Sequence, residues 1–375
     1  MTQTIDLDAE NVEEALFERG WTDGLPVVPP TPERVQAMLV AGELEPDEVV
    51  GTIASRGISV TAELAAANAV MAGAKPEYFP VIVAALGALM DPTLNAHMTL
   101  TSTGGPATCL IVSGPMAAAI GMNARHNALG SGNRANATIG RAVRLVAMNV
   151  LGARIGKLDA SSLGNPGKYT LCFAESEPKA PWEPLRVQLG YHEEDTVVVA
   201  LATESPRQVA NHLNGDAEGI LRTFVSAMRV PANFPVGKGG QCVVVLGPEH
   251  AGALLEAGWS QLDVRRFLAR ESRISVRDME AAGQILEKGS AFETTPDAAG
   301  MLPTVESFED VLLVTAGGEG AGWSAYIPSF SPAKVSRASS RRVKRPGEAL
   351  PDCGPEGCEI DWTRFQMPAA ERTPA

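Results

Sequence analysis

Side chains that could carry chemistry are concentrated in residues 97–152. His97 is followed by several hydroxyl side chains and a glycine pair, so that Ser102, Thr103 and Gly104 form a polar turn before an apolar stretch. Hydroxyl and backbone N–H groups in such a turn can bind a substrate oxyanion, and His97 can act as an acid or base. A lone histidine is more often structural, so both interpretations of His97 stay open.

A second polar segment, Gly130-Ser-Gly-Asn-Arg-Ala, leads into an expected helix. It matches the dinucleotide pattern formally, but no β-branched strand precedes it and no acid follows at the ribose-binding position, so we exclude a Rossmann site. The N–H groups of a helix start and nearby guanidinium groups suit a carboxylate or phosphate. The candidate substrate-binding residues here are Asn133, Arg134, Asn136 and Arg141. Alternatively, the asparagines cap the helix and the arginines pair with surface acids.

Two further pairs are candidates for proton transfer. Glu249 and His250 follow Gly247-Pro248 at the end of an expected strand, where open α/β sheets place their sites. Lys168 and Glu175 flank another expected strand and could bind an anion or exchange protons. A surface turn and an edge-strand acid explain the second pair equally well.

Metal and thiol patterns are weak. The five cysteines are spread along the chain, and Cys353 and Cys358 have the wrong spacing for a C-x-x-C pair, with no histidine nearby. G-x-S-x-G, H-E-x-x-H and Cys/His nucleophile patterns are absent from the sequence. We therefore expect no metal site, and the sequence identifies no cofactor.

The elements that position these residues show a repeat. Residues 104–118 and 239–251 each contain a glycine pair, a strand with a cysteine, a Gly-Pro turn and an alanine-bearing helix start. This indicates an α/β fold with two pseudo-repeated strand–Gly/Pro turn–helix halves around a mixed or parallel sheet. N-terminal helices and an irregular C-terminal tail complete it. The expected domains are an N-terminal helical arm (1–58), a first α/β half (59–190), a second α/β half (191–330) and a basic, poorly packed tail (331–375).

Composition limits the classes of function. The net charge of −13 argues against binding to nucleic acid or to an anionic membrane. Acids crowd the first 14 residues, which do not form a signal peptide. The uncharged run 92–124 is broken by glycine, proline and polar residues, so it is not a membrane span. We expect a cytoplasmic protein that forms a homo-oligomer.

Four segments carry a resemblance. These segments are Trp21-Thr-Asp-Gly-Leu-Pro-Val-Val-Pro-Pro-Thr, Asn127-Ala-Leu-Gly-Ser-Gly-Asn-Arg-Ala-Asn-Ala-Thr-Ile-Gly-Arg-Ala, Gly247-Pro-Glu-His-Ala and Ala316-Gly-Gly. In them the chain resembles a bacterial family associated with UGSC-motif (seleno)proteins. Those proteins are similar to the selenoprotein B components of glycine-type reductases. The resemblance covers about residues 10–335 and implies chemistry with a thiol or selenol supplied by a partner protein, because this chain has no UGSC motif.

These observations favour an enzyme or enzyme component that acts on a small anionic substrate, a carboxylate or a phosphate. Reductive cleavage, elimination and hydrolysis stay open as reactions. The alternative is a non-catalytic scaffold or regulatory subunit of a partner enzyme.

Overall fold

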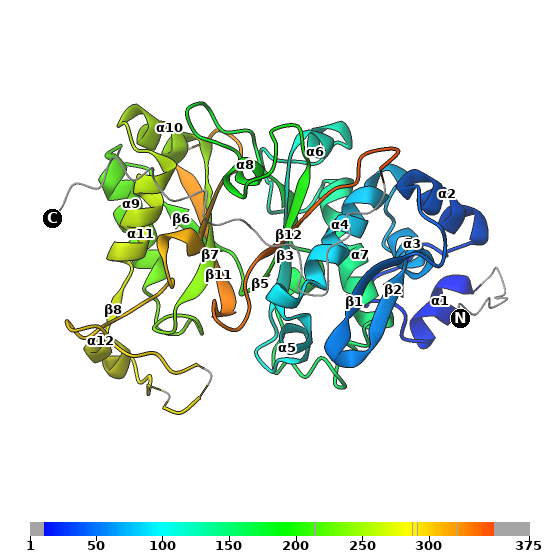
Figure 1. Ribbon diagram of the computed structural model, residues 1–375, viewed down its shortest axis with the longest axis horizontal. Coiled ribbons are helices and arrows are strands. Elements are labelled where there is room, and N and C mark those ends of the chain that lie inside the picture. Colours follow the sequence, from blue (N-terminus) through cyan, green and yellow to red (C-terminus); the bar gives the residue numbers. More distant parts are fainter. Residues whose placement is uncertain (1–10, 214, 287, 291, 321, 349–375) are drawn as a thin grey trace.

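The central eight-stranded sheet contains two matching sets of three strands (Figure 1). The computed structural model describes residues 11–348 except 214, 287, 291 and 321. The first set is β3 (Ala107–Ser113), β4 (Cys172–Ala174) and β5 (Val197–Thr203), and the second is β7 (Gly240–Leu246), β10 (Val311–Thr315) and β11 (Trp323–Pro332). β3 runs parallel to β4 and antiparallel to β5, and β7 runs parallel to β10 and antiparallel to β11. The predicted α/β fold with a mixed sheet is confirmed.

The two sets of strands meet at both of their edges. Ser329 of β11 pairs with Thr203 of β5, and at the opposite edge the Ser176 N–H donates to the Thr315 carbonyl at 2.8 Å. Apolar side chains from all six strands fill the space between the sets, among them Cys109, Ile111, Phe173, Val199, Val243, Leu312 and Ile327. Both faces of these strands are covered, which explains why they consist of nearly continuous apolar residues.

Helices cover the outer face of each set (Figure 1). The first set packs against α3 (Ala62–Met71), α4 (Phe79–Leu89) and α7 (Arg134–Asn149) in one hydrophobic core. The second set packs against α9 (Ala217–Met228), α10 (Pro248–Glu256) and α11 (Gln261–Glu271) in another. Ser260 and Asp263 form a capping box at the start of α11.

The Gly-Pro turns after β3 and β7 occupy equivalent places. Gly114 precedes α6 (Pro115–Ala119) and Gly247 precedes α10. A Cβ at Gly114 would lie 2.3 Å from the Asp195 carbonyl oxygen, and one at Gly247 would lie 2.0 Å from the Trp323 carbonyl oxygen. Both glycines are therefore required by the close approach of the antiparallel strand, which is why the pattern is visible twice in the sequence.

The N-terminal elements lie against the first half of the protein. They are α1 (Val12–Glu18), α2 (Pro32–Gly42), β1 (Val49–Ile53), η1 (Ala54–Arg56) and β2 (Ile58–Thr61), and β1 and β2 form a separate antiparallel hairpin. The shorter remaining elements are η2 (Pro76–Tyr78), η3 (Pro92–Leu94), α5 (Ala96–Thr101), η4 (Pro166–Lys168), α8 (Leu185–Gln188), β6 (Arg207–Ala210), β8 (Ile274–Ser275), α12 (Val276–Ala281), β9 (Met301–Leu302) and η5 (Phe308–Asp310).

The predicted poorly packed tail from residue 331 is wrong for its first part. β12 (Ser339–Arg342) pairs antiparallel with β5, and Val343 beyond it is buried. Small serine and alanine side chains let this segment pass between β5 and α4, and Arg341 has an acid partner in Asp91. Residues 349–375, with Cys353 and Cys358, lie outside the described residues. Within the described part of the chain, no helix is both long and apolar enough to span a membrane.

Candidate functional site

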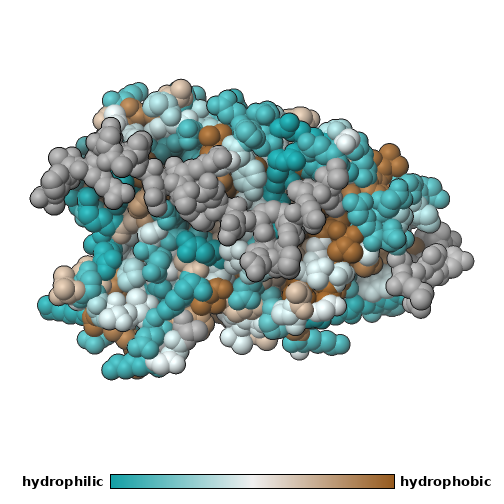
Figure 2. Space-filling view, viewed as in Figure 1, coloured by the Kyte–Doolittle hydropathy of each residue, from teal (hydrophilic) through white to brown (hydrophobic). Residues whose placement is uncertain are grey.

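A cavity of about 780 Å³ lies between α4, the β1–η1 segment and residues 341–344. On the face shown in Figure 2 the exposed surface is mostly hydrophilic, and hydrophobic side chains appear only in small separate patches. The walls of the cavity include the apolar side chains of Leu44, Val50, Ile53 and Val83.

One face of α4 forms the wall of the cavity. Pro80, Val83, Ala84 and Gly87 line it, with the i, i+3, i+4 and i+7 spacing of residues on one helix face. The cavity consequently follows the helix axis. The Arg341 side chain lies against this face at Gly87, where an added Cβ would be 3.4 Å from Arg341 Cγ.

Basic side chains border the cavity. Arg341, Arg342 and Lys344 line it together with the acids Glu48 and Asp91. The Arg341 Nη2 atom lies 2.8 Å from Asp91 Oδ2, an ion pair without the alignment of a hydrogen bond, and the Asp91 side chain is fully buried. The ion pair holds the Arg341 guanidinium in the cavity wall, because separating the two groups would leave the buried Asp91 carboxylate without its partner.

His97 is the predicted site residue that lines this cavity. It belongs to α5, whose first turn is capped by Asn95: the Asn95 Oδ1 atom accepts a hydrogen bond from the Met98 N–H at 3.4 Å. The predicted polar turn at Ser102–Gly104 follows this short helix, and the exposed His97 side chain faces the same space as Arg341.

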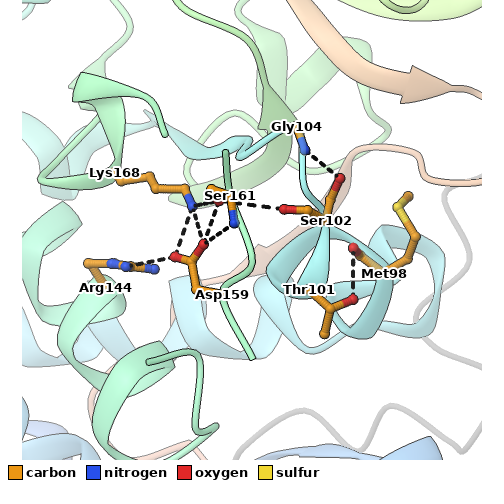
Figure 3. A network of polar contacts seen from close by, with 8 residues as sticks. All are labelled: Met98, Thr101, Ser102, Gly104, Arg144, Asp159, Ser161 and Lys168. Carbon is orange, nitrogen blue, oxygen red and sulfur yellow. Dashed lines mark hydrogen bonds and ion pairs between the residues drawn. The ribbon is translucent and has the colours of Figure 1, made fainter. Parts of the chain in front are cut away.

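Ser102, Gly104 and Lys168 lie together in a polar network that is centred on Asp159 (Figure 3). Lys168 Nζ donates to both Asp159 carboxylate oxygens at 2.8 and 2.9 Å, and Arg144 Nη2 donates at 3.0 Å. The Ser161 hydroxyl donates to Asp159 at 2.5 Å and accepts from Lys168 at 2.6 Å. Burial alone would raise the pKa of Asp159, but the hydrogen bonds from Lys168, Ser161 and Arg144 lower it to about 2.

This network fixes the loop that follows α7. Burial lowers the pKa of Lys168 while the contact with Asp159 opposes that shift. The polar atoms of the network form hydrogen bonds with one another. Gly105 packs against Ser161 so closely that an added Cβ would lie 2.8 Å from Ser161 Oγ. Thr103 joins the same packing, because its carbonyl accepts the Ser162 N–H at 2.8 Å. The contacts favour a structural role for Lys168.

Sequence reasoning missed Asp159 and Ser161, although one signal was present. Asp159 is the single acid among residues 92–174, a stretch that contains seven arginines and lysines. A lone acid among many cations is expected to be shared by several of them.

The polar residues of α7 hold the helix and the N-terminal segment in place. Asn133 Oδ1 accepts the Asn136 N–H at 3.0 Å as a helix cap, and the Asn136 amide bonds both backbone groups of Asn123. Arg134 Nε donates to the Gly73 carbonyl at 3.0 Å, and Arg141 forms an ion pair with Asp23. Asn133 thus caps the helix and Arg141 pairs with an acid, whereas Asn136 and Arg134 bond backbone groups, and none of these four residues lines the cavity.

His250 and Glu249 lie at the start of α10, away from the cavity lining. His250 is buried, with Nδ1 2.7 Å from Ser324 Oγ and Nε2 3.2 Å from the Asn211 carbonyl oxygen. Glu249 accepts a hydrogen bond from the Gly320 N–H. Both ring nitrogens of His250 thus have partners within the protein, as expected for a packed histidine.

Glu175 is buried at the end of β4. Its carboxyl oxygens accept hydrogen bonds from the Ser113 hydroxyl at 2.5 Å and from the Leu185 N–H at 2.9 Å. Burial raises the pKa of Glu175 to about 8, and these hydrogen bonds only partly oppose the shift. Glu175 lies next to Ser176, where the edges of the two strand sets meet, and it is separate from the cavity.

The cysteines of the described chain are not poised for nucleophilic chemistry. Cys109, Cys172 and Cys242 are buried and free, and burial raises the pKa of each thiol, that of Cys109 to about 12. Across residues 11–348, apart from the four gaps, no group of three or more His, Cys, Asp or Glu side chains is placed to hold a metal ion.

The chain matches no protein-family model and none of the curated proteins. We therefore infer function from the cavity and the residues that line it.

Proposed function

We propose that this protein is an enzyme or enzyme component that binds a small anionic molecule in the cavity beside α4. The observation that carries this proposal is a cavity of about 780 Å³ with an apolar wall and three basic side chains at its border. Small-molecule sites typically have this size and combine apolar walls with a few polar groups. The Arg341, Arg342 and Lys344 side chains would attract the carboxylate or phosphate group.

His97 would transfer a proton to or from the bound molecule. It is the one imidazole in the lining, and imidazole is the side chain best suited to proton transfer near neutral pH. A thiol or selenol nucleophile would come from a partner protein, because this chain has no UGSC motif and the cysteines of its described part, Cys109, Cys172 and Cys242, are buried. This proposal places the substrate on Arg341 rather than on Arg134 and Arg141.

Thermal shift and calorimetry with a panel of small carboxylates and phosphates test the proposal. Gly87→Leu places a larger side chain in the cavity, and Gly252→Leu is the matched control, because Gly252 also lies within a helix and has open space around its Cβ position. We expect the ligand that the wild type binds best to bind Gly252→Leu equally well and Gly87→Leu at least tenfold more weakly.

Equal binding by both variants would refute the assignment of the cavity. Absence of binding to the wild type, together with a stable complex with a partner protein, would favour the non-catalytic scaffold. Once a ligand is known, His97→Ala tests the catalytic role: it should leave binding nearly unchanged and slow turnover about 100-fold or more.

A further inference from the structure

We infer that the molecule bound beside α4 is an elongated aliphatic carboxylic acid. This inference rests on the proposed function and narrows the class of ligand. Three properties of the lining support it, namely its length along the helix, the type of its apolar side chains and its balance of charge.

The length comes from the α4 residues that face the cavity. Pro80 and Gly87 are two helical turns apart, and Met90 continues the lining past the end of the helix. At about 1.5 Å of rise per residue, the wall from Pro80 to Met90 is about 15 Å long. An extended chain matches this shape better than a compact molecule does.

The side chains of the wall are aliphatic. Leu44, Val50, Ile53, Val83 and Met90 contribute to the lining, and no Phe, Tyr or Trp occurs among the lining residues of the described chain. Nucleobases and aromatic acids are commonly held by stacking on aromatic rings. The cavity offers no such ring apart from the His97 imidazole, so an aliphatic body fits it best.

The charge balance favours one negative charge on the ligand. Two of the three basic side chains of the lining have acid partners outside it: Arg342 Nη1 lies 2.8 Å from Glu348 Oε2, and Lys344 Nζ lies 3.8 Å from Glu43 Oε2. Asp91 fixes Arg341 against α4, and Lys344 already donates to the Glu43 carbonyl at 2.8 Å. Within the described residues, Arg341 Nε makes no hydrogen bond, so it can donate to a carboxylate. A single carboxylate therefore suits the cavity better than a dianionic phosphate.

Calorimetry with the full chain tests this inference. The probes are linear alkanoates of about 4 to 16 carbons, the matching primary alcohols and an aromatic acid of equal carbon number. We expect the affinity to rise about threefold to fourfold for each added methylene until the cavity is filled, which is the effect of burying one methylene group. The alcohols should bind at least tenfold more weakly than the acids.

The two glycine variants separate failure of this inference from failure of the proposed function. Gly87→Leu should move the best chain length to a shorter acid, whereas Gly252→Leu should keep the wild-type profile. If short polar anions bind and Gly87→Leu weakens them, but chain length has no effect or the aromatic acid binds more tightly, the inference is wrong and the proposed function stands. If no anion binds the wild type, both are wrong.

Discussion

Arg141 and Asp23 form a two-point ion pair that joins α7 to the N-terminal segment. Arg141 Nε donates to Asp23 Oδ2 at 2.9 Å, and Nη2 donates to Oδ1 at 2.7 Å. Nη2 also donates to the carbonyls of Leu25 and Pro26. The Asp23 side chain is only 4% exposed and that of Arg141 14%. The segment around Trp21 is thus clamped to the first half of the protein.

We expect Arg141→Ala to lower the free energy of unfolding by about 3 kcal/mol, because it leaves the Asp23 carboxylate buried without its partner. Urea unfolding followed by circular dichroism measures the change. Arg222→Ala is the control: its pair with Glu218 is exposed and should contribute less than about 0.5 kcal/mol. Equal losses in the two variants would show that the Asp23–Arg141 pair is not a clamp.

The Asp159 network should make stability depend on acid pH. The folded pKa of Asp159 is lowered to about 2, below the ordinary value of 3.8, so its stabilising effect is present above about pH 4 and lost as the pH falls toward 2. Asp159→Asn should therefore be less stable than the wild type at pH 6, and the difference should shrink between pH 4 and 2. Urea unfolding across this range measures it. A difference that stays constant would contradict the shifted pKa.

The two duplicated halves could be predicted from the sequence because the pattern that marks each half lies within one short segment. Each half carries a Gly-Pro turn after an apolar strand, and the Gly114 and Gly247 positions exclude any other residue through close backbone contacts. β12 could not be predicted in this way. Its sequence, Ser-Ser-Arg-Arg, is polar and resembles a loop, and only its pairing with β5 and the contact of Arg341 with Asp91 make it a buried strand.

The cavity depends on contacts between distant parts of the chain. Its walls come from residues 42–55, 80–97 and 341–344, and no pattern within one segment indicates that these meet. His97 could be selected from its residue type alone. The choice of Arg134 and Arg141 followed from the rule that helix starts bind anions, but Asn133 caps this helix, Arg134 bonds the Gly73 carbonyl, and Arg141 pairs with Asp23.

Glu175 should make the stability of the protein depend on pH in the opposite sense to Asp159. Burial raises its pKa to about 8, so the folded state holds a proton that the unfolded state loses above about pH 4.5. The wild type should therefore lose stability as the pH rises from about 5 to 8, by at most about 1.4 kcal/mol per pH unit. Glu175→Gln should remove most of this slope in urea unfolding experiments, whereas Glu177→Gln, at an exposed neighbour, should retain it. An unchanged slope in Glu175→Gln would assign the titration to another group.

The segment after Phe330 should be essential for a stable first half. A chain that ends at Phe330 lacks β12, which pairs with β5, and leaves Asp91 buried without Arg341. We expect this chain to unfold at a much lower temperature than a chain that ends at Glu348, or to be insoluble. Arg341→Lys in the longer chain keeps the charge next to Asp91 and should lose much less stability. A truncated chain with an unchanged unfolding temperature would contradict the packing of β12.

The buried cysteines give a direct test of where thiol chemistry can originate. Cys109, Cys172 and Cys242 are inaccessible, and burial raises the pKa of each thiol, so none supplies a thiolate near neutral pH. In a Cys353→Ser, Cys358→Ser variant, we expect no rapid reaction with a thiol reagent at pH 7 and three reactive thiols after unfolding in urea. A fast-reacting thiol in the folded variant would place a nucleophile within the described chain. That outcome would remove the reason for assigning the thiol or selenol to a partner protein.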